Sequence, residues 1–149
     1  MSAPEAAVAR FEQGYSCAQA VFSALAEPQG LERDMAYRVA AGFGGGLARS
    51  GQTCGCVTGA IMGLGLAQTG VSPEQNRSEK EKTYARVQRF MREFAARHGS
   101  THCLHLLGCD ISTAEGLSFA RQNGLFQSRC TRLVRDATEL AAAILAERG

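Results

Sequence analysis

The chain has 149 residues, of which 45% are hydrophobic and 20% are charged, and its formal net charge is +2. This length and composition predict one globular domain, residues 1–149, that can bury a core without help from metals or disulfides. The basic residues are scattered and tryptophan is absent, so the sequence offers neither a charged patch nor a stacking platform for nucleic acid. We therefore expect no nucleic-acid partner.

The N-terminal segment lacks the features of a signal peptide, because acidic residues occur early and an apolar core is missing. The longest uncharged apolar run is shorter than the roughly 20 residues that a membrane-spanning helix needs. We therefore expect a cytoplasmic protein without a membrane span. In such a reducing compartment, the six cysteines are expected to bind metal or to perform thiol chemistry, not to form structural disulfides.

Helices are predicted from the start of the chain. The first covers residues 3–13, and a second follows Ser16, which can cap it, over residues 17–26. A third covers residues 34–41. The glycine-rich residues 42–46 that follow are expected to loosen the chain, that is, to interrupt its regular helical structure.

Residues 53–67 contain no charged side chain and predict a helix that is buried on nearly all sides. Thr53 is expected to cap its start. Gly55, Gly59 and Gly63 recur every fourth residue and therefore share one face. Because each mid-helix glycine costs about 1 kcal/mol relative to alanine, another group must approach that face closely. We favour close packing against a second helix; a bound group at Gly55 and Gly59 is the alternative, and the row also suggests a homodimer.

The second half of the chain is also helical. Ser72 with Gln75 predicts a long helix over residues 73–97, and a short helix is expected over residues 103–107. Ser112 with Glu115 forms the pattern of another capping box, which opens a helix that ends at residues 123–124. The last helix is expected over residues 127–147. Since no segment alternates as a strand does, the predicted fold class is all-α, a compact multi-helix bundle around the glycine-rich helix.

Four cysteines occupy similar places in this scheme. Cys17, Cys54 and Cys103 fall in the first turn of a predicted helix, and Cys130 lies near the start of the last one. Free N–H groups and the helix dipole stabilise a thiolate at such positions, so we expect a lowered pKa at each of these cysteines. This shared placement predicts that the four converge at one site.

The remaining cysteines are expected to matter less. Cys56 follows Cys54 by two residues, which on a helix points it about 200° away from Cys54. Cys109 is expected on a loop. Either could act as a resolving cysteine. His98 is expected at a helix C-terminus, where partial positive charge is favourable.

Several motifs resemble, in the same order, the C-GCAxxG-C-C family, whose members are described as redox-active. They are residues 14–21 (GYSCAQAV), 42–46 (GFGGG), 54–60 (CGCVTGA) and 103–108 (CLHLLG), followed by Cys130. The resemblance covers nearly the whole chain. It implies four family cysteines, here Cys17, Cys54, Cys103 and Cys130. It also implies that Cys56 stands where the family usually has alanine, either as a harmless replacement or as a gained ligand.

Two redox mechanisms follow from these cysteines. In the first, Cys17, Cys54, Cys103 and Cys130 ligate an iron–sulfur cluster or another thiophilic metal, and the protein transfers electrons. In the second, the same cysteines exchange disulfides with an unidentified redox partner, which makes the protein an oxidoreductase. The lack of a Cys-x-x-Cys pair disfavours the second slightly, so the sequence favours the first. A helical interaction protein without redox activity is the third alternative.

Overall fold

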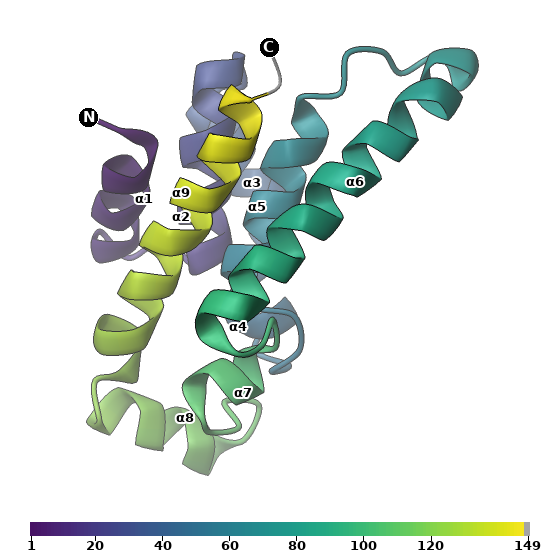
Figure 1. Cartoon of the computed structure of the whole chain (residues 1–149). Coiled ribbons are helices and arrows are strands. Elements are labelled where there is room, and N and C mark those ends of the chain that lie inside the picture. Colours follow the sequence, from purple (N-terminus) through teal and green to yellow (C-terminus); the bar gives the residue numbers. More distant parts are fainter. Residues whose placement is uncertain (148–149) are drawn as a thin grey trace.

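The structure is a computed structural model that describes residues 1–147. Within these residues every regular element is a helix, which confirms the all-α prediction, and one isolated antiparallel bridge joins Thr53 to His102. Figure 1 shows how the helices pack together. In chain order they are α1 (Ala3–Glu12), α2 (Cys17–Ala26), η1 (Glu27–Gln29), α3 (Arg33–Val39), α4 (Gly44–Leu47), α5 (Gly55–Leu66), α6 (Pro73–His98), α7 (Cys103–Leu107), α8 (Ala114–Gln122), η2 (Phe126–Cys130) and α9 (Thr131–Ala146).

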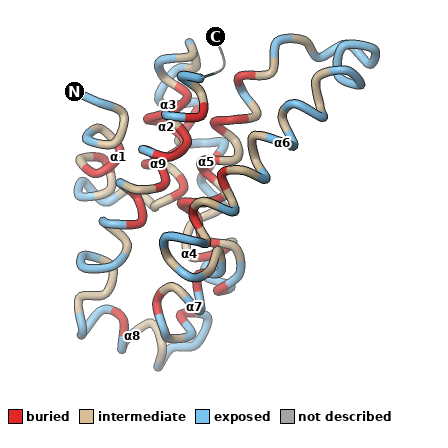
Figure 2. Tube along the Cα trace, in the orientation of Figure 1, coloured by how far each residue is buried: buried red, intermediate tan, exposed pale blue. Residues whose placement is uncertain are grey.

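The core lies between α1, α2, α5 and α9, with the C-terminal half of α6 packed against them (Figure 1). Figure 2 shows buried segments of α2, α5 and α9 facing one another, whereas the N-terminal half of α6 is exposed and extends away from the bundle. Phe90 and Phe94 are the fully buried residues that hold α6 to the core. No helix within residues 1–147 combines the length and the apolar character needed to cross a membrane.

A capping box fixes where α2 begins. The Ser16 hydroxyl accepts a hydrogen bond from the Gln19 N–H at 3.2 Å, and the Gln19 side-chain oxygen accepts one from the Ser16 N–H at 3.0 Å. Both contacts satisfy N–H groups that a helix start leaves unpaired. As a result, Cys17 becomes the first residue of α2, as the sequence predicts.

The glycine row of α5 packs against α2 of the same chain. A Cβ atom added at Gly59 would lie 2.8 Å from the Ala18 carbonyl oxygen, and one at Gly63 would lie 2.8 Å from the Leu25 Cβ atom. Real Cβ atoms do not approach other heavy atoms so closely, so glycine is needed at both positions for the two helices to meet. This agrees with the close-packing explanation. Since α2 already covers the row, the row no longer argues for a homodimer.

Two predicted helix caps are wrong. Cys54, not Thr53, is the N-cap residue of α5, because the backbone bridge at Thr53 holds that residue in an extended strand-like pairing. Thr113, not Ser112, caps α8 by accepting a hydrogen bond from the Gly116 N–H. Ser112 instead donates its backbone N–H to the Asp110 carboxylate at 3.0 Å, a local turn that competes with capping.

Candidate thiol site

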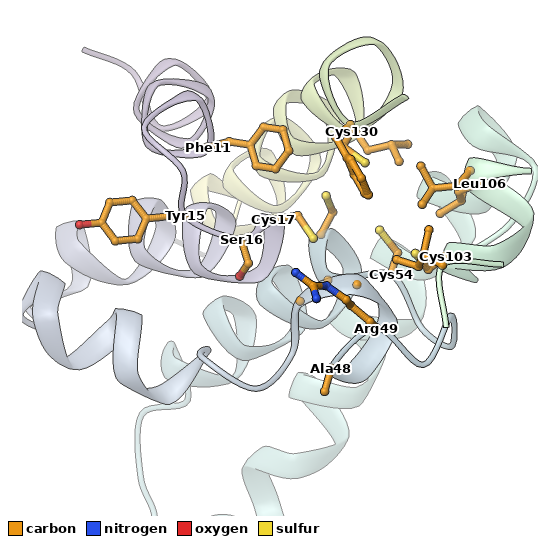
Figure 3. Close-up of a pocket in the computed structure, with 18 of the residues that line it drawn as sticks. Phe11, Tyr15, Ser16, Cys17, Ala48, Arg49, Cys54, Cys103, Leu106 and Cys130 are labelled. Carbon is orange, nitrogen blue, oxygen red and sulfur yellow. The ribbon is translucent and has the colours of Figure 1, made fainter. Parts of the chain in front are cut away.

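A cavity of about 580 Å³ opens where α2, α4, α5, α7 and η2 meet. Figure 3 shows Cys17, Arg49, Cys54, Cys103 and Cys130 reaching this cavity from separate segments of the chain. The four cysteines predicted to form the site all line this cavity, and a fifth, Cys56, lines it as well. Cys109 is not among the lining residues. The cavity therefore gathers the predicted site residues in one place, although their chemical roles stay predictions.

Four neighbouring groups stabilise the charged form of the Cys17 sulfur. This sulfur accepts from the thiols of Cys54 and Cys56 and from the backbone N–H groups of Gly45 and Ala18. Hydrogen bonds to a thiolate stabilise it relative to the thiol. These donors therefore hold the pKa of Cys17 well below its ordinary value in spite of its burial, and the Cys54 thiol has the largest effect. Cys17 is half-buried. The arrangement therefore provides a thiolate that a small reagent can reach.

The Gly45 donor is supplied by an unusual backbone turn. Five successive residues adopt left-handed φ values: Gly45 (67°), Gly46 (70°), Leu47 (67°), Ala48 (51°) and Arg49 (64°). Hydrogen bonds close the turn, including one from the Arg49 N–H to the Gly44 carbonyl at 3.0 Å. Left-handed backbone costs roughly 1–2 kcal/mol for each residue that carries a Cβ atom. Strain of this kind concentrates at functional sites, and here it aims an N–H group at a cysteine sulfur.

The thiols of Cys54 and Cys56 act as donors to Cys17. Cys54 is 4% exposed and Cys56 is fully buried. Hydrogen bonding to the Cys17 thiolate raises the pKa of Cys54 well above its ordinary value. Burial is the first cause that raises the pKa of Cys56, and its hydrogen bond to Cys17 is the second. Both side chains are therefore protonated at neutral pH and stabilise the negative charge on their neighbour.

The contact of Cys56 with Cys17 differs from what the sequence predicts. Helical geometry at both Cys54 and Cys56 would point the two side chains apart. Cys54 is instead the N-cap residue with φ −54° and ψ 137°, outside the helix, so both side chains can reach Cys17. The signal that could have shown this is the Cys-Gly-Cys sequence at a helix start, where the first cysteine need not follow the helix.

Gly55 lies directly against the Cys17 sulfur. A Cβ atom added at Gly55 would lie 2.5 Å from the Cys17 Sγ atom and 3.1 Å from the Ala18 backbone nitrogen. Gly55 lines the cavity, whereas Gly59 is not among the lining residues and faces α2; a binding role for either glycine stays a prediction. The cavity geometry thus requires a glycine between Cys54 and Cys56.

Cys103 does not have the lowered pKa that its helix position predicts. It is the first residue of α7, but its backbone N–H donates to the Gln52 carbonyl at 2.6 Å, and the next N–H, that of Leu104, donates to the Gly51 carbonyl at 3.1 Å. The helix start therefore has these N–H groups paired with backbone. Burial raises the pKa of Cys103 to about 12, with the negative charge of Cys17 as a second cause.

Cys130 also differs from its prediction. It does not follow a free helix start, because it is the last residue of the π-helical turn η2, which continues into α9. Without unpaired N–H groups to offset it, burial raises the pKa of Cys130. Cys103 is buried in a small hydrophobic cluster against which Cys109 and Cys130 pack. Of the four cysteines for which a lowered pKa was predicted, Cys17 is thus the one that has it.

The arrangement of the side chains does not present a ready metal site. Among residues 1–147, no group of three or more histidine, cysteine, aspartate or glutamate side chains is placed to hold a metal ion. Cys54 and Cys56 direct their thiols at the Cys17 sulfur, which differs from sulfurs that surround a common ligand position. Within residues 1–147 the structure therefore shows no ready position for an iron–sulfur cluster between the predicted ligands, and their ligation of a cluster stays a prediction.

Comparison with known proteins places these observations in a family. Residues 15–144 match the family model described as "Putative redox-active protein (C_GCAxxG_C_C)". The chain belongs to this family. The match spans most of the chain and includes all the cysteines that line the cavity, and it confirms the resemblance inferred from the motifs. The curated proteins and the solved structures give no match.

Proposed function

We propose that this C_GCAxxG_C_C family member performs thiol–disulfide exchange and that Cys17 is its attacking nucleophile. The observation that carries the proposal is the set of donors around the half-buried Cys17 sulfur: two thiols and two backbone N–H groups. A thiolate is the reactive form of cysteine, and exchange needs a second thiol within reach. Cys17 supplies the first, and Cys54 and Cys56 supply candidates for the second.

The reaction proceeds in two steps with a disulfide, R–S–S–R′, as the oxidant. The Cys17 thiolate attacks one sulfur of R–S–S–R′, which forms a mixed disulfide between Cys17 and R–S and releases R′–S⁻. The Cys54 thiol then loses its proton to the released thiolate and attacks the Cys17 sulfur. This step forms the Cys17–Cys54 disulfide and releases R–S⁻. Two protein thiols are oxidised, and R–S–S–R′ gains two electrons.

The second step is coupled to the first through the pKa of Cys54. The hydrogen bond to the Cys17 thiolate keeps Cys54 protonated in the reduced protein. Once Cys17 enters a mixed disulfide, its negative charge is gone, and that cause of the raised pKa disappears with it. Cys54 therefore becomes easier to deprotonate at the moment when its attack is required. Cys56 donates to the same sulfur and is the alternative resolving thiol.

Disulfide mapping tests this proposal. Reduced protein is treated with 2-hydroxyethyl disulfide under anaerobic conditions, quenched with acid, alkylated and mapped by mass spectrometry. We expect a mixed disulfide on Cys17 at early times and a Cys17–Cys54 bond later. In Cys54→Ser we expect the mixed disulfide on Cys17 to accumulate. If Cys56 resolves it instead, the mixed disulfide should accumulate only in the double variant Cys54→Ser with Cys56→Ala. Protein whose Cys17 remains free while other cysteines are oxidised would contradict the proposal.

The iron–sulfur hypothesis remains a second proposal, supported by the number of cysteines that line one cavity and by the preference of thiolates for thiophilic metals. It requires Cys17, Cys54, Cys103 and Cys130 to rearrange around a common centre. Iron and acid-labile sulfide analysis of protein purified without oxygen, together with its visible spectrum, tests it. We would abandon thiol exchange in favour of electron transfer if such protein contained stoichiometric cluster that was lost in each of the four cysteine-to-serine variants.

A further inference from the structure

Resting on the proposed thiol exchange, we infer that the disulfide substrate is a small molecule that carries a carboxylate, and that Arg49 and Arg121 attract this carboxylate to the cavity. Three features of the cavity lead to this substrate class: its size, the apolar side chains in its lining and the sign of the charges that line it. Each restricts the substrate independently.

The size of the cavity fits a small molecule. Its volume of about 580 Å³ lies within the range of roughly 300–1,000 Å³ that is typical of small-molecule sites. Apolar side chains form part of the lining, contributed by Leu107 of α7, Ile111, Leu117 of α8 and Phe126 of η2, which belong to one hydrophobic cluster. A short aliphatic disulfide can therefore pack its methylene groups against these side chains while one sulfur faces Cys17.

Apart from the Cys17 thiolate itself, the charged side chains of the lining are positive. These are Arg49 and Arg121, and no carboxylate is among the lining residues. Both arginines are exposed, and neither forms an ion pair or a side-chain hydrogen bond within residues 1–147. Each guanidinium is thus free to bind an anion, and a carboxylate matches its paired N–H donors. A cationic disulfide would meet repulsion from the same two guanidinium groups.

The left-handed turn fixes the position of Arg49. The Arg49 side chain packs over Gly45, so closely that a Cβ atom added at Gly45 would lie 2.9 Å from the Arg49 Cγ atom. Gly45 is the residue whose N–H donates to the Cys17 sulfur, and Figure 3 shows the Arg49 side chain extending from the turn toward Cys17. The same strained turn therefore supplies a hydrogen bond to the nucleophile and a cation for the substrate.

The inference is tested with three symmetric disulfides of similar length that differ in charge: 3,3′-dithiodipropionate, which is anionic, 2-hydroxyethyl disulfide, which is neutral, and cystamine, which is cationic. Second-order rate constants for oxidation of the reduced protein are divided by those for a small thiol under the same conditions. We expect the normalised rates to fall from the anionic to the neutral to the cationic disulfide. Added salt should reduce the differences, because exposed charges are screened.

Charge variants assign the preference to Arg49. In Arg49→Gln we expect the ratio of the anionic to the neutral rate to fall by up to about fivefold, the effect of losing one exposed charge pair. Arg49→Lys should restore most of the ratio. Arg77→Gln is the matched control, since Arg77 is an exposed arginine on the protruding half of α6, and it should keep the ratio of the natural protein.

A protection experiment tests the site without any redox step. Suberate has the length of dithiodipropionate but no disulfide, and 1,8-octanediol is its neutral counterpart. We expect suberate to slow the reaction of Cys17 with iodoacetamide in a saturable manner, and we expect this protection to be lost in Arg49→Gln. Octanediol should protect less.

The outcomes separate the two levels of the argument. Equal normalised rates for the three disulfides, or an unchanged ratio in Arg49→Gln, would overturn the substrate class while leaving thiol exchange intact. Oxidation by a protein disulfide but by none of the small ones would do the same. If Cys17 reacts with no disulfide of any kind, the proposed function fails, and the protection by suberate then decides alone whether the cavity is an anion site.

Discussion

Two sides of the cavity each carry a cysteine at the start of a helix, and the pKa values of these two cysteines are shifted in opposite directions. We call these sides the two walls: one carries Cys17 and the other carries Cys103. On one wall, Cys17 begins α2 and has a lowered pKa; on the other, Cys103 begins α7 and has a raised one. The difference lies in where the nearby N–H groups point. Those of Gly45 and Ala18 donate to the Cys17 sulfur, whereas those at the start of α7 donate to carbonyls of residues 51–52. A cysteine at a helix start thus becomes a stable thiolate only if the N–H groups remain available to sulfur.

Alkylation of the reduced protein should separate the two walls by the largest effect. At pH 7 we expect Cys17 to react with iodoacetamide at least on the order of 10³ times faster than Cys103, because the thiolate is the nucleophile and the pKa of Cys103 is about 12. The Cys17 rate should change less between pH 7 and 9 than the Cys103 rate, because the pKa of Cys17 is lowered. The Cys103 rate should rise about tenfold per pH unit over the same interval. Timed alkylation followed by peptide mass spectrometry measures both.

Two controls accompany this measurement. Protein unfolded in denaturant should show similar rates at the two cysteines, which proves that the difference comes from the fold. In Cys54→Ala the Cys17 profile should move to higher pH, because the thiol that donates most strongly to its sulfur is gone. Similar rates at Cys17 and Cys103 in the folded protein would remove the distinction between the walls.

Gly55→Ala alters only the wall that carries Cys17, and we expect it to have a smaller effect on the reactivity of Cys17 than the difference between the two walls. The new methyl group would lie 2.5 Å from the Cys17 sulfur and 3.2 Å from the Phe43 carbonyl oxygen, so α2 and α5 must move apart. We expect a loss of about 1–3 kcal/mol in the free energy of unfolding and a higher pKa for Cys17. Chemical denaturation and the alkylation profile measure these changes.

Other glycines of α5 provide matched controls. Gly59→Ala should also destabilise the protein, because its methyl group would lie 2.8 Å from the Ala18 carbonyl oxygen, but it should affect the pKa of Cys17 less. Gly65→Ala meets no heavy atom within 4 Å and should stabilise the helix by up to about 1 kcal/mol. If all three variants shift Cys17 equally, the contact at Gly55 is not what orders this wall.

Local signals in the sequence were sufficient for most of the helices and for part of the site, but not for α4, which lies where a loosened glycine-rich segment is predicted, nor for the π-helical turn η2. Ser16 as a helix cap predicts the start of α2 at Cys17, and this is where the helix begins. Glycines spaced by four predict the close approach of α5 to another helix, which α2 provides. These features depend on residues within one or two turns, and physical rules for such short spacings are reliable.

The chemistry of each thiol could not be predicted in the same way, because it depends on contacts between distant segments. Cys103 loses its N–H donor to Gln52, a residue on another part of the chain. Cys17 gains the N–H of Gly45 through a left-handed turn, and neither Leu47 nor Arg49 signals such a conformation, since only glycine adopts it readily. Helical geometry at Cys54 predicts that Cys56 points away from it, but Cys54 lies outside the helix. These three differences concern the direction of a group.

The smallest predicted effect concerns the turn that serves both walls. Its Gly45 end donates to Cys17, and the carbonyls that follow it, those of Gly51 and Gln52, accept from the start of α7. Ala48 lies in the turn with φ 51°, so Ala48→Gly relieves steric strain and, after the entropy cost of glycine, should stabilise the protein by up to about 1 kcal/mol.

The matched control for this variant is Ala143→Gly, on the exposed face of α9, which should destabilise the protein by about 1 kcal/mol because its residue is helical. Denaturant titrations of the two variants and the natural protein give the comparison. Opposite signs would support a strained turn that is held in place by its hydrogen bonds to both walls. A loss of stability in Ala48→Gly as large as that in Ala143→Gly would mean that the backbone at residue 48 is not left-handed, and the source of the N–H donated to Cys17 would then need another explanation.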